Sequence, residues 1–175
     1  MIHTSDIDGL LIVDRPTHED ERGFVREPYR LNELEEAVGR PLRFGQQNHA
    51  RTRQGVLRGL HAEGWDKLID VPRGRVFQAV ADIRVASATF GRVMTCELGD
   101  ASRLSLFLPA GVANGYCALS EEADYVYLVT AYYDGSDTRA VRWDDPDLAV
   151  PWPISTPLLS ERDQHNPSLR ELAPQ

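Results

Sequence analysis

The residues whose types could support catalysis are concentrated between positions 55 and 67, where the chain reads GVLRGLHAEGWDK. A histidine between two strand-like segments is usually structural, but Arg58 and Lys67 stand close to His61 here. Two cations inside a fold are costly unless an anion meets them. The stretch therefore favours proton transfer by His61 on an anionic substrate. Strand alternation puts Arg58 and His61 on opposite faces, so both reach one pocket only if Gly59 marks a bulge or kink.

Other kinds of catalytic site find less support in the residue pattern. Zinc and iron sites need three or four N, S or O ligands, and no two histidines stand at ligand spacing, although His61 and Glu63 form an HxE pair. A GxSxG nucleophile motif is absent, and GVLRG lacks the helix that should follow a phosphate-binding loop. The sequence therefore predicts no bound catalytic metal. The histidines are His3, His18, His49, His61 and His165.

Length, charge and cysteine content narrow the class further. We expect one domain over residues 1–175, because no repeat or linker interrupts the chain. The net charge of −8 argues against nucleic acid or an anionic membrane as a partner. Cys96 and Cys117 form no disulfide framework and are expected to be reduced. With no signal peptide and no run of ~18 apolar residues, we expect a cytoplasmic protein.

The elements that must position these residues are mostly strands. Short β-type runs alternate with good turn chemistry, which predicts an all-β sandwich or barrel, with a jelly roll as the best choice. Residues 31–39 (LNELEEAVG) have helical periodicity ending at a glycine, and a second helical turn is expected over residues 168–172. The predicted strands are GLLIV, GFVREPYR, VLRGLHA, KLIDV, RVFQAVADIR, RVMTCEL, LSLFLPA, YVYLVTAYY and TRAVRW.

The run DYVYLVTAYY predicts which side chains of one of these strands share a face. Strand alternation puts Tyr125, Tyr127 and Tyr133 on the same face. Phenols on an inward face would line an interior pocket with hydroxyl groups. Composition alone favours the other interpretation, in which they are girdle or interface aromatics, and the sequence leaves both open.

Nine segments together resemble a known family, the dTDP-4-dehydrorhamnose 3,5-epimerases, which are cupin-like enzymes of nucleotide-sugar biosynthesis. They occur in the family's order and cover nearly the whole chain, and GVLRGLH with VADIR and SxTFG is highly specific. The segments are DERGFVRE (20–27), QQNHAR (46–51), GVLRGLH (55–61), the single lysine Lys67, GRVFQAVADIR (74–84), TFGR (89–92), LPAGVANGY (108–116), YVYLVTAYY (125–133) and LSERD (159–163).

The resemblance implies a double-stranded β-helix, or jelly roll, that forms a homodimer in which the N-terminal strands reach across to the partner. It also implies chemistry without a metal or an organic cofactor. The implied substrate is a nucleoside-diphosphate 4-keto-6-deoxyhexose, inverted at C3, at C5 or at both. Both carbons flank the C4 ketone, so loss of either proton gives an enolate that requires a base, an acid and a cation at O4.

The resemblance also assigns catalytic roles by position. His61 matches the base, and a neutral imidazole, with a reference pKa of about 6.5, suits neutral pH. Asp163 matches its carboxylate partner, which would hold the tautomer and stabilise the imidazolium. Tyr127 matches the acid on the opposite face, because a phenol keeps its proton until an enolate forms. Lys67 matches the cation expected near O4.

Substrate-binding positions carry over in the same way. Arginine suits bidentate phosphate contacts, so two arginines are expected at the diphosphate. Two amides fall where the family contacts diphosphate or sugar, and a glutamate and a tyrosine match positions near the nucleobase. Asp82 is expected either to support these binding residues without touching the substrate itself, or to have a purely structural role. The binding positions are Arg22 and Arg58, Gln46 and Asn48, and Glu27 and Tyr133.

The chain departs from the family pattern at a few positions. Asn114 stands where the family usually has a pocket histidine, in a segment, LPAGVANGY, expected to be a loop beside the sugar ring. Val25 replaces an aromatic residue, and the connection from His61 to Lys67 is short. These departures leave open the sugar, the nucleotide and the choice of carbons. They also leave two alternatives, a cupin-type 3,4-ketoisomerase and a non-catalytic sugar-nucleotide-binding module.

Overall fold

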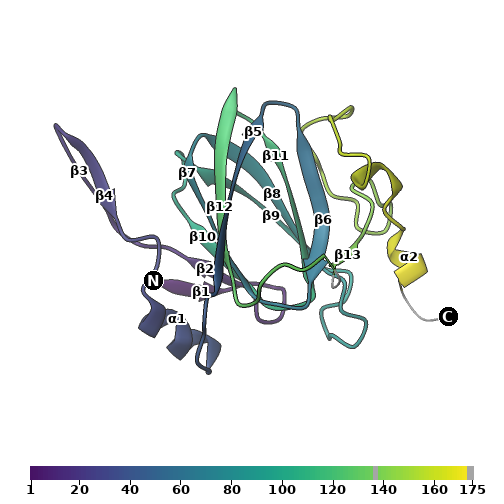
Figure 1. The fold of residues 1–175 in the computed structure, drawn as a ribbon, viewed down its shortest axis with the longest axis horizontal. Coiled ribbons are helices and arrows are strands. Elements are labelled where there is room, and N and C mark those ends of the chain that lie inside the picture. Colours follow the sequence, from purple (N-terminus) through teal and green to yellow (C-terminus); the bar gives the residue numbers. More distant parts are fainter. Residues whose placement is uncertain (136–137, 173–175) are drawn as a thin grey trace.

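The computed structural model of the protein describes residues 1–135 and 138–172 and has the predicted jelly-roll architecture, with two antiparallel sheets packed face to face (Figure 1). One sheet has the order β1 (Ile2–Thr4), β2 (Leu11–Val13), β10 (Ser105–Leu108), β7 (Lys67–Arg73), β12 (Glu122–Val129) and β5 (Gln46–Arg53). The other has the order β13 (Thr138–Ala140), β6 (Leu57–Glu63), β11 (Val112–Ala118), β8 (Arg75–Asp82) and β9 (Val93–Gly99).

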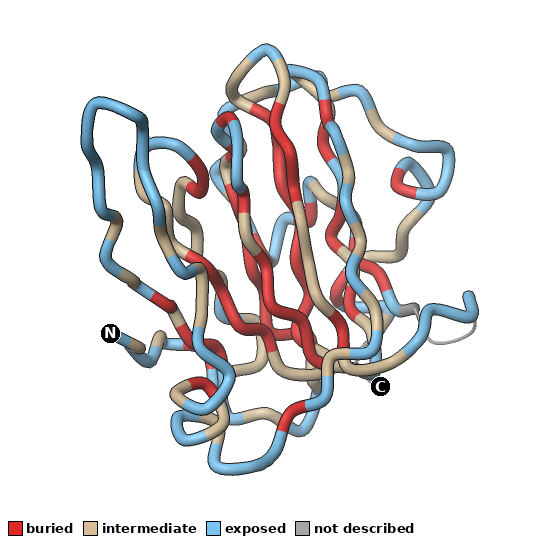
Figure 2. Tube along the Cα trace, turned by 60° about the vertical axis from the view of Figure 1, so that its left-hand side comes forward, coloured by how far each residue is buried: buried red, intermediate tan, exposed pale blue. Residues whose placement is uncertain are grey.

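The main core lies between the two sheets. Aliphatic residues such as Ile69 of β7, Val80 of β8 and Leu106 of β10 are fully buried there. The inward face also carries the stacked rings of Tyr116 and Tyr125, one from each sheet, with centroids 3.9 Å apart. Figure 2 shows that the buried residues follow the central strands of the sandwich. The interior is therefore apolar over much of its length, and it becomes polar at the level of Tyr116 and Tyr125.

The outer faces of both sheets are covered by segments that are not strands. The helix α1 (Leu31–Val38) packs Leu34 against Leu68 and Phe107 on the outer face of the six-stranded sheet. Its C-cap is Gly39 in the left-handed conformation, as the sequence predicts. The segment after β13, which includes the 3₁₀ turn η1 (Asp163–His165) and α2 (Leu169–Leu172), covers the outer face of the five-stranded sheet.

The strands that were predicted are present in the structure, but two strands that build the site, β5 and β11, were not predicted. The segment 108–116, expected as a loop, contains most of β11, which lies in the middle of the five-stranded sheet between β6 and β8. The Ala, Asn and Gly residues of VANGYCA carry little β-propensity, and pairing with two neighbours overrides that weakness. The polar run QQNHARTR forms β5 because β12 pairs with it along its whole length.

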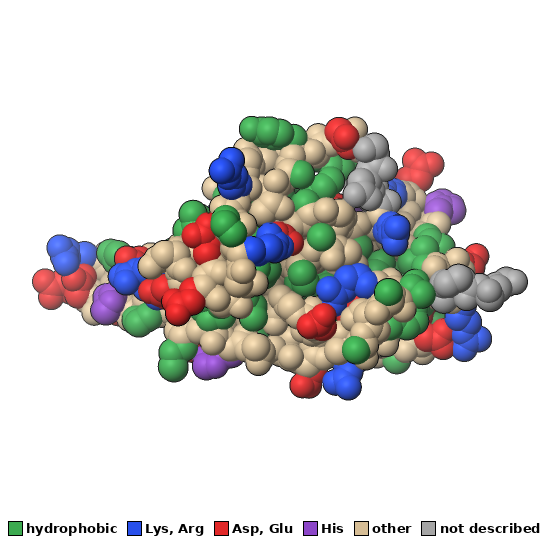
Figure 3. All heavy atoms as spheres, turned by 90° about the horizontal axis from the view of Figure 1, so that it is seen from below, with side chains coloured by type: hydrophobic (Ala, Val, Ile, Leu, Met, Phe, Trp, Pro, Cys, Tyr) green, Lys and Arg blue, Asp and Glu red, His purple; other side chains and the backbone are tan. Residues whose placement is uncertain are grey.

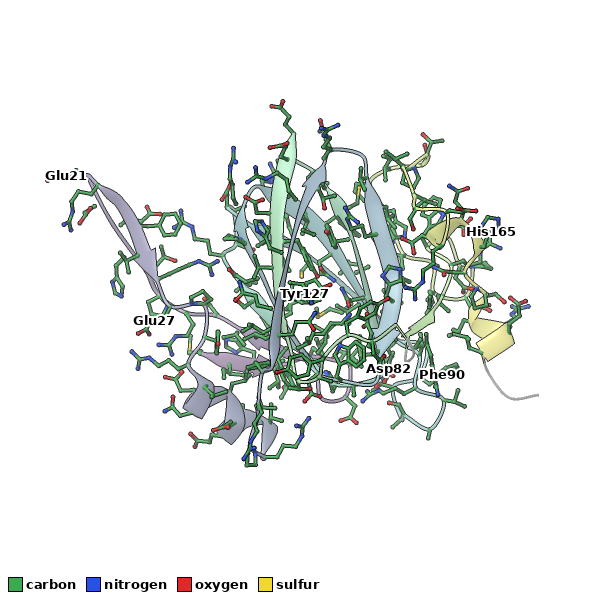
Figure 4. The ribbon with its side chains drawn as sticks, in the orientation of Figure 1. Glu21, Glu27, Asp82, Phe90, Tyr127 and His165 are labelled. Atoms are coloured by element: carbon green, nitrogen blue, oxygen red, sulfur yellow. The ribbon has the colours of Figure 1, made fainter. Side chains whose placement is uncertain are left out.

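A two-stranded hairpin projects from the sandwich (Figure 1). It consists of β3 (Thr17–Asp20) and β4 (Gly23–Arg26), and its tip, near Glu21, lies far from Tyr127 in Figure 4. The hairpin is tied down at its base, where Arg26 donates to Asp70 Oδ1 at 2.7 Å. Val25 remains 73% exposed, so the outer part of the hairpin has little contact with its own chain.

Acidic and basic side chains are interspersed over the face of the molecule seen from below (Figure 3). Many of them form exposed ion pairs, such as Arg75 with Glu97 and Arg170 with Asp147. Within residues 1–135 and 138–172, no helix is long and apolar enough to cross a membrane.

Candidate active site

A cavity of about 280 Å³ lies between the two sheets, among residues that both sheets and the C-terminal segment contribute. The strands β6 and β11 form one wall, β5, β7 and β12 form the other, and residues 160–163 close one side. Its lining is polar and aromatic, which makes it unlike the rest of the interior. The lining residues are Ala50, Arg58, His61, Glu63, Lys67, Ile69, Asn114, Tyr116, Tyr125, Tyr127, Ser160, Arg162 and Asp163.

The strand β6 presents both Arg58 and His61 to this cavity because it is kinked at Gly59. In the pairing with β11, Arg58 lies opposite Tyr116 and His61 opposite Asn114, so β6 uses one residue more than β11 over the same span. Gly59 has φ +129°, and a Cβ there would lie 2.4 Å from the Cα of Gly115. The predicted kink is therefore present, and it requires glycine.

His61 and Asp163 form a hydrogen-bonded pair at the edge of the cavity, with 2.5 Å between His61 Nε2 and Asp163 Oδ1. Asp163 is 3% exposed, and burial raises the pKa of its carboxyl group. The contacts from His61 and the Gly59 N–H outweigh burial, so this pKa lies below its ordinary value. An ionised carboxylate accepts the proton of Nε2, which leaves the lone pair of the imidazole on Nδ1.

Lys67 begins β7 and extends into the cavity, where it is 6% exposed. Its ammonium group forms an ion pair with Glu63 and donates to Asn114 Oδ1 at 3.0 Å. The same ammonium lies 5.7 Å from the centre of the Tyr127 ring. Burial lowers the pKa of Lys67, and the nearby Glu63 carboxylate opposes that effect without cancelling it. The cation is therefore held in place by two neighbours and faces the same space as Tyr127.

The tyrosines of β12 line the cavity, as the first of the two sequence interpretations predicts. Tyr125 is fully enclosed: its hydroxyl donates to Gln78 Oε1 at 2.9 Å and accepts from Asn114 Nδ2 at 3.2 Å. Tyr127 is partly buried, and burial together with Glu63 raises its pKa above the ordinary value. A phenol in this environment keeps its proton well above neutral pH.

A second lobe of about 200 Å³ continues the site toward the connection between β12 and β13. It shares four residues with the main cavity: His61, Glu63, Tyr127 and Arg162. Its other lining residues are Asn48, Trp65, Val129 and Tyr133. Trp65 and Tyr133 meet edge to face with centroids 6.4 Å apart, so this lobe offers aromatic surface where the main cavity offers charge.

Most of the predicted site residues meet in these two lobes. The four predicted catalytic residues, with Arg58 and Asn114, line the main cavity, and Asn48 and Tyr133 line the second lobe. Gln46 stands behind the second lobe, where it donates to Asn48 and accepts from the Tyr133 N–H. Asn114 lies inside β11 and not in a loop, which corrects the sequence expectation.

Three other positions lie outside the cavity of their own chain. Arg22 is exposed at the hairpin turn and pairs with Asp20, and Glu27 at the hairpin base pairs with Arg15 and Arg30 (Figure 4). Asp82 is fully buried and bonds to Arg84, Ser87 and Thr89, so its role is to order the loop that follows β8. Cys96 and Cys117 are free thiols, as expected.

Sequence reasoning missed several side chains that line the site. Glu63 was noted only as half of an HxE pair, and its position two residues after His61 on a strand was the signal that it faces the same way. Ser160 and Arg162 precede Asp163 in LSERD, and Trp65 lies in the short turn before Lys67. Among the described residues, no group of three His, Cys, Asp or Glu side chains is placed to hold a metal ion.

The fold and the pocket together define a class, a cupin-like enzyme equipped for proton transfer. The family model described as dTDP-4-dehydrorhamnose 3,5-epimerase matches residues 4–171. The chain belongs to this family and is an isomerase of the epimerase type.

Individual relatives agree with this assignment. A dTDP-4-dehydrorhamnose 3,5-epimerase from Shigella flexneri is 39% identical over 165 residues, 91% of this chain and 90% of that protein. A dTDP-4-dehydrorhamnose 3-epimerase from Streptomyces niveus is 40% identical over 162 residues, 90% of this chain and 78% of that one. The crystal structure of a dTDP-6-deoxy-D-glucose-3,5-epimerase from Legionella pneumophila, in complex with dTDP-4-keto-L-rhamnose, superposes with a TM-score of 0.91 at 36% identity, covering 100% of this chain and 97% of that one.

Proposed function

We propose that the protein inverts C3, C5 or both in a nucleoside-diphosphate 4-keto-6-deoxyhexose by proton transfer through an enolate. The observation that carries the proposal is that His61, Lys67 and Tyr127 line one cavity. These are the base, the cation and the acid that the reaction needs. The relatives named above, two of them 3,5-epimerases and one a 3-epimerase, support the substrate class and leave the choice of carbons to experiment.

In the first step, Nδ1 of His61 takes the proton from the carbon beside the ketone. The electron pair of the broken C–H bond forms a double bond to C4, and the π electrons of the C4=O4 bond move to O4, which becomes negatively charged. Asp163 stabilises the imidazolium that forms, since the hydrogen bond from Nε2 becomes a charged pair. Lys67 then faces the oxyanion as a buried ammonium, where electrostatic stabilisation is stronger than in water.

In the second step, the O–H of Tyr127 delivers a proton to the same carbon from the opposite face. The double bond returns to the ketone, and the configuration is inverted. The tyrosinate regains a proton and the imidazolium loses one, so the enzyme is restored without net gain or loss. The raised pKa of Tyr127 supports this role, because the phenol remains protonated until the enolate forms.

The diphosphate and the nucleoside are proposed to bind along the opening of the site. Arg58 reaches the cavity from β6, and Arg162 lines both lobes, so each can meet a phosphate. We also propose a cytoplasmic homodimer, in which Arg22 and Glu27 on the hairpin of one protomer contribute to the site of the other. The projection of this hairpin away from its own cavity supports that arrangement.

The experiment that tests the function is NMR of a 4-keto-6-deoxyhexose nucleotide incubated with the protein in deuterated water. We expect deuterium at C3, at C5 or at both, together with a product of inverted configuration. Migration of the carbonyl from C4 to C3 would instead identify a ketoisomerase. Binding without either exchange or product would identify a non-catalytic binding module.

A further inference from the structure

The cavity contains one carboxylate that the proposed mechanism does not use, that of Glu63. This residue ends β6, two positions after His61, and lines both lobes of the site. Its Oε2 atom is buried and faces the ammonium group of Lys67, with which it forms an ion pair. The side chains of the pair are only 13% and 8% exposed, so water screens their attraction weakly.

Lys67 is the only lysine in the chain, beside 18 arginines. The other groups that line the cavity around it offer little compensation for its charge. Asp163 is engaged by His61, and Asn114 supplies only the neutral Oδ1 oxygen. The remaining polar groups in the lining are Arg58, His61, Tyr116, Tyr125, Tyr127, Ser160 and Arg162, which are either neutral or cationic. Glu63 is thus the carboxylate that meets Lys67 among the described residues of the site.

We propose that Glu63 is a positioning residue that keeps Lys67 protonated and directs its ammonium group, together with Asn114, toward the ketone oxygen. The inference rests on the proposed function, since it extends the role given there to Lys67. A buried lysine loses its proton readily, whereas a buried arginine stays charged without a partner. A lysine at this position therefore needs a neighbouring carboxylate to remain an ammonium, and Glu63 supplies it.

The effect of the carboxylate depends on pH. At a pH where Lys67 is protonated in any case, removing Glu63 should lower turnover only through the loss of one of the two contacts that orient the ammonium group. At higher pH, removal should cost activity because the ammonium is lost. Burial already lowers the pKa of Lys67, and loss of Glu63 lowers it further, which moves the alkaline limit of activity to lower pH.

The test uses Glu63→Gln, which keeps the shape of the side chain and removes its charge. Because the chain has one lysine, protein labelled with ¹³C at lysine Cε gives a single lysine signal, whose titration reports Lys67 directly. We expect this titration to move down by at least about one pH unit in the variant, a tenfold change in proton affinity. The alkaline limb of kcat should move by the same amount.

The control is Glu36→Gln, which removes the same charge from an exposed position on α1 and should leave both profiles unchanged. Glu63→Asp, whose carboxylate is retained but shortened, should shift the lysine titration part of the way, and it decides the question if Glu63→Gln does not fold. A lysine titration that coincides with wild type in the Glu63 variants would overturn the proposal. The titration needs no substrate, so it distinguishes this failure from a failure of the proposed epimerisation.

Discussion

Asp163 accepts a hydrogen bond from His61 although 102 residues separate them in the chain. His61 comes from β6 of the five-stranded sheet, whereas Asp163 begins the 3₁₀ turn of the C-terminal segment that covers the same sheet from outside. Asp163 also accepts from the backbone N–H of Gly59 at 3.4 Å, so it contacts the kink and the base together.

This pair leads to a graded prediction for exchange at the ketone-flanking carbons. His61→Ala should abolish deuterium uptake, with a loss of about 10³-fold or more, because no other group takes the proton. Asp163→Asn should cost about 10²-fold, since it disturbs the tautomer but leaves the imidazole in place. Uptake can be followed by NMR in deuterated water. An Asp163→Asn variant as active as wild type would contradict the assigned partnership.

Tyr127→Phe should separate exchange from inversion. Removal of the hydroxyl leaves the base intact, so an enolate still forms and can be reprotonated on its original face. We expect deuterium uptake to persist at a measurable rate while the inverted product falls by about 10²-fold. Tyr132→Phe, at a position 75% exposed, is the matched control and should behave as wild type. If exchange and inversion vanished together in Tyr127→Phe, the separate roles of acid and base would be wrong.

Asn114 joins Lys67 to Tyr125, since it accepts from the ammonium and donates to the phenol. A histidine at this position could still accept one hydrogen bond and donate one, and it would add a titratable group. On the rhamnose-pathway keto-sugar, we expect wild type to label C3 and C5 at very different rates and Asn114→His to narrow the difference. Asn32→His, on the exposed face of α1, controls for the substitution itself. Rapid and equal labelling of both carbons by wild type would refute this role for Asn114.

Activity should not depend on a metal ion, because each proton and the oxyanion have a side chain assigned to them. We expect full turnover after prolonged treatment with a chelator, and a metal content well below one per chain by elemental analysis. The assignment of the oxyanion to Lys67 would fail if chelation stopped turnover and one particular metal restored it.

Gly59→Ala should destabilise the protein more than an ordinary glycine substitution. The new Cβ would stand 2.4 Å from Gly115 Cα at φ +129°, and we expect a loss of about 3 kcal/mol in the free energy of unfolding. Gly23→Ala has a similar φ of +120° with no atom within 4 Å, so about 1 kcal/mol is expected there. Urea denaturation measures both. Equal losses would mean that the close approach of β6 to β11 does not matter.

The sequence by itself determined the fold class, the family and most of the residues of the site. Short runs bounded by turn residues, a helix ending at Gly39, and motifs such as GVLRGLH are local patterns, and local patterns can be read from the chain. Strand alternation also put Tyr125 and Tyr127 on one face, although the sequence left open whether that face points inward. It even required a kink at Gly59, because Arg58 and His61 could not otherwise meet.

Only the tertiary structure determined which of these residues are neighbours, how deeply they are buried and which charge they carry. The weak β-propensity of VANGYCA concealed β11, which forms because β6 and β8 pair with it on both sides. That placement brings Asn114 to Lys67. The burial of Lys67 and its pairing with Glu63 depend on how β6, β7 and β11 enclose one space. Charge state in a protein interior is set by the groups that surround a side chain, and those groups come from distant parts of the chain.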